Sequence, residues 1–168
     1  CTNLKSIDLS HVDEVGEYSF EESKLESVNL DGVKTIGQYA FNKSAELKVI
    51  TMGDGLVSIG QSAFFQTAVE SAKIPGTVTK IGKYSFATIG ELSERDLAKV
   101  KTIGDNAFLE CSGITSLNLP DADSIGESAF LKCTGLENVT LGSAEHCVTK
   151  IGKRAFNICT NLKSIDLS

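Results

Sequence analysis

The sequence predicts a short, curved solenoid in which about seven repeats of about 22 residues stack with their parallel strands side by side. Two recurring patterns predict this fold. The first is a six-residue block with an aliphatic residue first, glycine second and phenylalanine last. Its seven copies begin at Val15, Ile36, Ile59, Ile81, Ile103, Ile125 and Ile151. The second is an apolar-x-x-apolar-x-apolar pattern that occurs eight times, starting with Leu4, Ile7 and Leu9.

The apolar-x-x-apolar-x-apolar segments are predicted to be strands. A further apolar residue lies three residues before each block, as Val12 does before Val15, and adds a second extended piece to every repeat. A single repeat cannot bury its Leu, Ile and Phe side chains, whereas stacked repeats join each column into a continuous apolar spine. Strands about 4.8 Å apart would give a stack roughly 34 Å long.

Glycine and proline mark the corners of the repeat. Seven of the 15 glycines hold the second position of the block. The other eight lie in loops before or after the strands, where positive φ is often required. Pro75 and Pro120 directly follow the last apolar residue of a strand, where the missing N–H costs no ladder hydrogen bond.

The phenylalanine column is predicted to be core rather than an aromatic binding stripe. Seven of the eight Phe residues fall in it, and each follows a small Ala or Ser, as close packing at a corner requires. Truncating one of them should cost roughly 3 to 5 kcal/mol. Because each repeat is supported only by its neighbours, the loss would propagate along the stack.

The composition fits one globular domain over residues 1–168, which could be a segment of a longer array. Of the 168 residues, 41% are hydrophobic and 23% are charged. The formal net charge of -6 gives no basic footprint for a nucleic acid. No apolar run approaches the roughly 18 residues of a transmembrane segment. We therefore expect neither a nucleic-acid partner nor a membrane span.

Three sequence motifs together resemble the BspA-like, or treponemal, class of leucine-rich-repeat proteins. They are the Leu-x-x-Ile-x-Leu strand, the Val-x-x-Ile-Gly-x-x-Ala-Phe block, and the turns Cys-Thr-Asn-Leu, Cys-Ser-Gly-Ile and Cys-Thr-Gly-Leu. The resemblance covers essentially the whole chain. It implies a leucine-rich-repeat solenoid with a parallel sheet on the concave side and short strands, turns and single-turn helices elsewhere.

The resemblance also implies a function. Similar proteins are exported or surface-exposed and bind other proteins without catalysing a reaction, which is an inference from fold alone. By this resemblance we expect an extracellular, cell-surface or periplasmic microbial protein that acts in adhesion or partner recognition. We expect no cofactor.

Four cysteines occupy one repeat position, three residues after the block Phe: Cys1, Cys111, Cys133 and Cys159. Other repeats have Ser or Thr there, so a small, weakly polar side chain that satisfies turn backbone groups explains them. In-register stacking points neighbouring side chains the same way, which does not favour a disulfide. Cys1 could instead be a lipidated terminus.

No catalytic or metal-binding set is evident. His146 and Cys147 are adjacent in a six-residue insertion, but a metal site needs three or four converging ligands. No Ser, His and Asp set, phosphate loop or CxxC pair occurs. A surface loop is the better interpretation of the insertion, and we do not expect an enzyme.

Polar residues at outward strand positions form the first candidate binding surface. They could be a solvated ladder with weak ion pairs or the concave recognition surface of a solenoid. The first column is Lys5, Glu26, Lys48, Glu70, Ser93, Thr115, Glu137 and Lys163. The second column is Asp8, Asn29, Thr51, Lys73, Asp96, Asn118, Thr140 and Asp166.

The residues that follow the block Phe form the second candidate surface. Four consecutive repeats have Phe65, Ala87, Leu109 and Leu131 there. Stacking would place these side chains in a stripe, which marks an interface if it is exposed. The alternative is that the stripe is half buried against the next turn.

The fifth repeat is the third candidate. Arg95 stands in a strand column that other repeats fill with Ile, Val or Leu, and a buried unpaired guanidinium is very costly. Arg95 must therefore reach Glu94 or Asp96, extend to water, or lie in a distorted strand. We expect local irregularity there, with a pocket for a small apolar ligand as a further alternative.

Residues 1–10 recur identically as residues 159–168, so the chain starts and stops at the same point of the repeat. Unpaired terminal strands expose backbone groups. The chain is therefore either a segment of a longer array or a homo-oligomer through its terminal repeats. The overall prediction is a protein-binding module, with a self-assembling structural module as the alternative.

Overall fold

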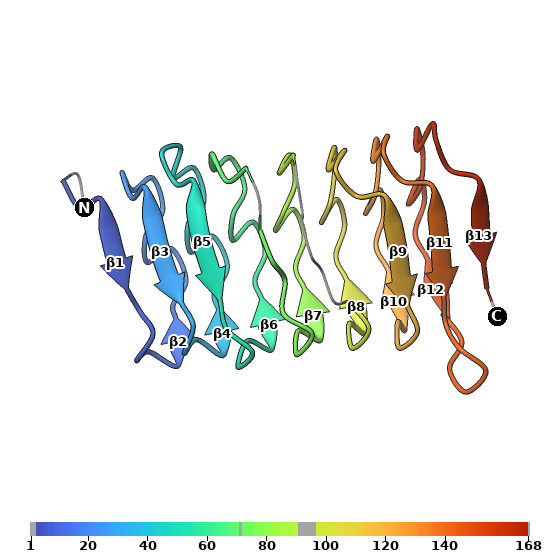
Figure 1. The fold of residues 1–168 in the computed structure, drawn as a ribbon, viewed down its shortest axis with the longest axis horizontal. Coiled ribbons are helices and arrows are strands. Elements are labelled where there is room, and N and C mark those ends of the chain that lie inside the picture. The colour runs from blue at the N-terminus through green and yellow to red at the C-terminus, as the bar shows by residue number, and fades with distance from the viewer. Residues whose placement is uncertain (1–2, 71, 91–96, 168) are drawn as a thin grey trace.

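The computed structural model describes residues 3–70, 72–90 and 97–167. The chain winds as a parallel-sheet solenoid of stacked rungs (Figure 1). One set of strands forms two separate three-stranded sheets: β1 (Ser6–Asp8), β3 (Ser27–Leu30) and β5 (Val49–Met52), and then β9 (Ser116–Leu119), β11 (Asn138–Leu141) and β13 (Ser164–Asp166). We call the outward side of these two sheets the two-sheet face.

A second, continuous sheet runs along the solenoid and has seven strands of two residues each. They are β2 (Glu14–Val15), β4 (Thr35–Ile36), β6 (Ser58–Ile59), β7 (Lys80–Ile81), β8 (Thr102–Ile103), β10 (Ser124–Ile125) and β12 (Lys150–Ile151). We call its outward side the seven-strand face, and number rungs 1 to 7 by these strands. All pairings are parallel and join equivalent repeat positions, as Ile7 joins Val28 and Ile59 joins Ile81.

The phenylalanine spine is confirmed. Rings in successive rungs stack from Phe20 to Phe156, with centroids 5.1 to 5.7 Å apart. The five inner rings are fully buried: Phe41, Phe64, Phe86, Phe108 and Phe130. Because every rung adds the same ring at the same place, the spine excludes water along its five inner rings.

The turns that carry this spine differ from the expectation of single-turn helices. The described residues include no helix, and the segments after the block glycine are turns. Fourteen non-glycine residues there have positive φ, between 51° and 68°, in two columns that contain Tyr18 and Glu22 of rung 1. This conformation points each N–H along the axis: Tyr18 donates to the Gln38 carbonyl and Glu22 to the Asn42 carbonyl, at 3.0 and 2.8 Å.

The expectation of positive φ at the described loop glycines is met at one of them. Among the described glycines only Gly142 has positive φ. The block glycines instead permit close approach of the rungs, because a Cβ on Gly104 would lie 2.5 Å from the backbone nitrogen of Lys83. The rungs pack backbone against backbone along this column.

The cysteine column is explained by the turn, as predicted. The Sγ atoms of Cys111, Cys133 and Cys159 lie 3.0, 3.1 and 3.2 Å from the carbonyl oxygens of Phe86, Phe108 and Phe130, each one rung earlier. The described cysteines in this column are buried thiols. Ser44 makes the same contact to Phe20 with its hydroxyl, at 2.8 Å.

Candidate functional site

The two-sheet face presents three outward columns, of which sequence reasoning identified two. The missed column belongs to the strands themselves and consists of Ser6, Ser27, Val49, Ser116, Asn138 and Ser164. Two residues separate the first and second apolar positions of the strand pattern, and the period-two alternation of a strand turns the second of them outward. That period was the available signal. The predicted Lys5 column lies one residue before the strands.

The predicted site residues of this face do not form one continuous row. Three of them, Lys5, Glu26 and Lys48, are exposed beside the first sheet. Glu70 is exposed at the equivalent position of the next repeat. Asn118 and Thr140 lie on β9 and β11 of the second sheet, the former exposed and the latter half-buried. Ser93, Arg95 and Asp96, with the irregular fifth strand expected there, lie outside the described residues.

A shallow hollow of about 440 Å³ lies over β1, β3 and β5. Its lining is Ser6, Ile7, Asp8, Ser27, Val28, Asn29, Asp31, Val49 and Thr51. Val49 begins the edge strand β5 and is 58% exposed, which is high for an aliphatic side chain. The hollow thus offers one apolar contact at its edge beside short hydroxyl, amide and carboxylate groups.

Hydrogen bonds hold the polar groups of the hollow in place. The Ser10 N–H donates to Asp8 Oδ1 at 2.9 Å, and the Asp31 N–H donates to Asn29 Oδ1 at 3.1 Å. Thr51 Oγ1 donates to the same Asn29 oxygen at 3.1 Å, which ties two rungs together. The hydrogen bond from Ser10 lowers the pKa of Asp8 below its ordinary value, so this carboxylate is charged at neutral pH.

Ion pairs frame the same sheet. Lys5 Nζ lies 2.7 Å from Glu46 Oε2 and 3.0 Å from Glu26 Oε1. These hydrogen bonds, that to Glu46 first, raise the pKa of Lys5, and Lys5 lowers the pKa of Glu46. All three side chains are well exposed, so solvent screens these pairs and each contributes little to stability. The second sheet has a similar pair between Lys163 and Glu137 at 2.8 Å.

The stripe after the block Phe is largely covered. Phe65, Leu109 and Leu131 are half-buried and Ala87 is buried, which matches the alternative of packing against the next turn. Phe65 also contacts Tyr84, with ring centroids 5.5 Å apart. Partner binding by this column stays a prediction.

The insertion folds as a small loop. Ser143 and His146 exchange backbone hydrogen bonds of 2.7 and 3.1 Å, and His146 Nε2 lies 3.2 Å from Asp123 Oδ1. In the part of the chain that the structure describes, no group of three or more His, Cys, Asp or Glu side chains could hold a metal ion. Nor do the described residues include a helix long and apolar enough to cross a membrane.

Parallel rungs of this length, with a leucine-containing strand and a stacked phenylalanine corner, define the class of leucine-rich-repeat solenoids. The family model for the BspA type leucine rich repeat region matches six copies over residues 1–93 and 93–168. The chain belongs to this family. Members are typically non-enzymatic scaffolds and generally protein-interaction modules.

A solved structure from T. pallidum gives the same result for the fold. A leucine-rich-repeat protein from T. pallidum aligns with a TM-score of 0.76 and 25% identity, covering 96% of this chain and 79% of that one. A leucine-rich cell surface protein from Faecalibacterium prausnitzii aligns with a TM-score of 0.49 and 20% identity, over 99% and 73% of the two chains. The pneumococcal vaccine antigen PcpA aligns at 0.44 and 18%, over 91% and 59%. No curated protein matches the chain.

Proposed function

We propose that this chain is a non-catalytic protein-binding module and that the β1–β3–β5 part of its two-sheet face holds the partner. The observation that carries the proposal is the hollow around Val49. An exposed aliphatic side chain at the edge of a row of fixed polar groups combines the apolar and polar contacts of a small protein interface.

The rigidity of the face supports the same proposal. Asp8, Asn29 and Thr51 occupy equivalent positions on three strands paired in register, and their hydrogen bonds fix them before a partner arrives. A preorganised surface loses less conformational entropy on binding.

The test is capture of extracellular proteins on the immobilised chain, with an unrelated repeat protein as background. Val49→Arg places a charge and a long side chain in the hollow. Val57→Arg is the matched control, because Val57 is 45% exposed but belongs to the seven-strand face. We expect a partner that wild type and Val57→Arg retain and Val49→Arg loses. Equal capture by all three variants would contradict the site, and no specific capture would contradict the function.

We also propose that this module acts outside the cytoplasm, in adhesion or partner recognition. This proposal rests on membership of the BspA-type family. Labelling intact source cells with a membrane-impermeant amine reagent tests it. The chain should be labelled as strongly as a known surface protein, and labelling only after lysis would argue against a surface location.

Self-association through the terminal rungs stays a prediction. Ile151, Ile158 and Ile165 at the C-terminal end are 46%, 49% and 44% exposed, and these side chains are the surface that such a contact would bury. A monomer across a wide concentration range in analytical ultracentrifugation would contradict it.

A further inference from the structure

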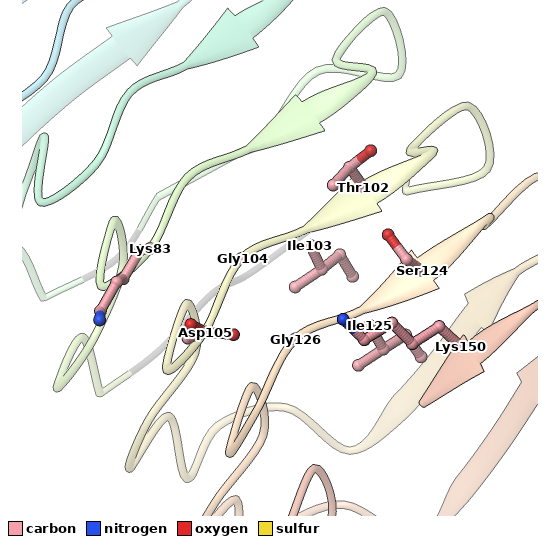
Figure 2. Close-up of a pocket in the computed structure, with 9 residues that line it drawn as sticks. All are labelled: Lys83, Thr102, Ile103, Gly104, Asp105, Ser124, Ile125, Gly126 and Lys150. Carbon is pink, nitrogen blue, oxygen red and sulfur yellow. The ribbon is translucent and has the colours of Figure 1, made fainter. Parts of the chain in front are cut away.

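A second hollow, on the seven-strand face, is far from the one described above. It is a shallow groove of about 280 Å³ that crosses β8 and β10 (Figure 2). Its lining is Lys83, Thr102, Ile103, Gly104, Asp105, Ser124, Ile125, Gly126 and Lys150. Figure 2 shows Lys150 extending from β12 toward Ile125, and Lys83 and Asp105 on the other side of the glycines.

The glycine column explains the groove. A Cβ on Gly104 or on Gly126 would lie 2.5 Å from backbone atoms of the preceding rung, so no side chain can fill this line. The floor of the groove is therefore bare backbone. One wall consists of the Thr102 and Ser124 hydroxyls, and the other begins with Lys83. Such a trough accommodates an extended chain that lies along the solenoid axis.

The lining of the groove has a net positive charge, from two lysines against one aspartate. Lys83 and Lys150 line it, and Lys80 and Lys101 lie on the same face. Among the described residues none of these four lysines makes an ion pair within 4.0 Å, and the Lys83 ammonium lies 5.5 Å from the centre of the Tyr84 ring. The one acid in the lining, Asp105, accepts the Glu127 N–H at 2.8 Å.

The acidic charge of the chain is concentrated elsewhere. Residues 11–31 hold seven Asp and Glu and one Lys, a net charge of -6. The other 15 acidic residues are balanced by the other 15 Lys and Arg residues, from totals of 22 and 16. Residues 11–31 span β2 and β3 at the N-terminal end, whereas the groove lies beyond the middle of the stack (Figure 1). The groove is thus locally attractive to anions on a protein of net negative charge.

We propose that this groove binds an extended acidic segment of a partner protein, with carboxylates four residues apart paired to Lys83 and Lys150. Lys83 follows β7 and Lys150 lies on β12, which are three strand spacings apart in the order β7-β8-β10-β12. Along the solenoid axis, three spacings of about 4.8 Å make roughly 14 Å, and four residues of an extended peptide span roughly 13 Å. Lys150 is in register with Lys80, so it also lies three residues across the rung from the Lys83 position, an offset that the two long lysine side chains span. Side chains four apart lie on the same side of an extended chain and can both face the groove. Ile103 and Ile125 lie beneath the floor and are 1% and 0% exposed, so the occupant meets the two lysines and the Thr102 and Ser124 hydroxyls.

The probe is a fluorescein-labelled ten-residue peptide of Ser, Thr and Val with Glu at positions 3 and 7, and its anisotropy is measured at low ionic strength. We expect saturable binding to the wild-type chain. The double variant Lys83→Glu with Lys150→Glu should weaken peptide binding by about tenfold or more, because two charge pairs become repulsive. Ser124→Tyr, which fills the groove without changing charge, should also weaken it. A peptide with Gln at both positions, and one with Glu at positions 3 and 4, should bind more weakly.

Lys24→Glu with Lys48→Glu is the matched control, because it changes the net charge equally at two exposed lysines away from the groove. It should leave affinity within about twofold. Equal weakening by the two double variants would overturn the proposal, as would binding of a sulfated oligosaccharide without binding of the peptide, or no binding by wild type. Val49→Arg should not change peptide binding, so this result is independent of the proposed function.

Discussion

A Cβ atom placed on Gly82 would lie 2.5 Å from the carbonyl carbon of Gly60, one rung earlier, and 2.6 Å from the nitrogen of Gln61. Both contacts are with backbone, which cannot rotate away. Gly16 holds the same position in rung 1 and meets only the Ser19 hydroxyl, at 3.3 Å. The spacing of the rungs, rather than the conformation of the residue, therefore requires glycine here.

Gly82→Ala should accordingly destabilise the protein by at least the roughly 1–3 kcal/mol of an over-packed core. Gly16→Ala should change stability by less than about 1 kcal/mol, and can be stabilising because alanine restricts the unfolded chain. Urea unfolding followed by circular dichroism measures both. Equal effects of the two substitutions would show that close packing along the column is not the constraint.

Ile158 is a β-branched residue with φ of 59° and is 49% exposed. The left-handed conformation costs an L-residue about 1–2 kcal/mol, and asparagine tolerates it best after glycine. Ile158→Asn should therefore raise the free energy of unfolding by about 1 kcal/mol. Val57→Asn is the control, since Val57 is similarly exposed at a position without positive φ, and it should not stabilise. A loss of stability in Ile158→Asn would contradict this account.

The phenylalanine spine predicts a gradient of stability along the stack. Phe86 is fully buried between Phe64 and Phe108, whereas Phe20 at the end of the spine is only partly buried. Phe86→Ala should cost about 3–5 kcal/mol and broaden unfolding, because it separates the two halves of the stack. Phe20→Ala should cost clearly less. Hydrogen exchange would locate the loss, and equal costs would indicate that the rungs do not depend on their neighbours.

Cys133 donates from a buried thiol to the Phe108 carbonyl, where rung 2 uses the Ser44 hydroxyl. Cys133→Ser keeps a donor and should cost less than about 1 kcal/mol, while Cys133→Ala leaves the carbonyl without it and should cost about 1–3 kcal/mol. Thiol labelling of the native chain, localised by mass spectrometry, should modify Cys147 rapidly and the buried Cys133 only on unfolding. Rapid labelling of Cys133 would contradict the buried hydrogen bond.

The Lys5 and Glu46 pair predicts a limited pH window of stabilisation. The lowered pKa of Glu46 means that its contribution is present above the ordinary value of 4.5 and is lost as pH falls through the lowered one. The raised pKa of Lys5 means that its contribution is present below 10.5 and is lost as pH rises beyond it.

Lys5→Met should therefore be slightly destabilising near neutral pH and indistinguishable from wild type in acid, where Glu46 is protonated. Unfolding by urea at a series of pH values measures the difference. Lys48→Met is the control because Lys48, also exposed, makes no ion pair among the described residues. A difference for Lys5→Met that does not change with pH would exclude the ion pair as its cause.

The repeat spacing by itself determined which residues share a column. Phe41 and Phe86 had to stack, and Cys133 had to occupy the position of Ser44, because every rung rests on an equivalent rung. It also placed Asp8 and Asn29 on the outward side. It also contained the signal for the column of Val49, because the period-two alternation of a strand turns the second of the two intervening residues outward, but that column was missed.

Only the tertiary structure decided which columns are exposed to solvent and how neighbouring rungs contact each other. Left-handed turns at Tyr18 and Glu22, where glycine would be expected, follow from hydrogen bonds to the next rung that the sequence of one rung does not encode. The groove between Lys83 and Lys150 exists because neighbouring backbones touch along the glycine column. Periodicity determines what repeats, whereas exposure depends on how closely adjacent rungs approach.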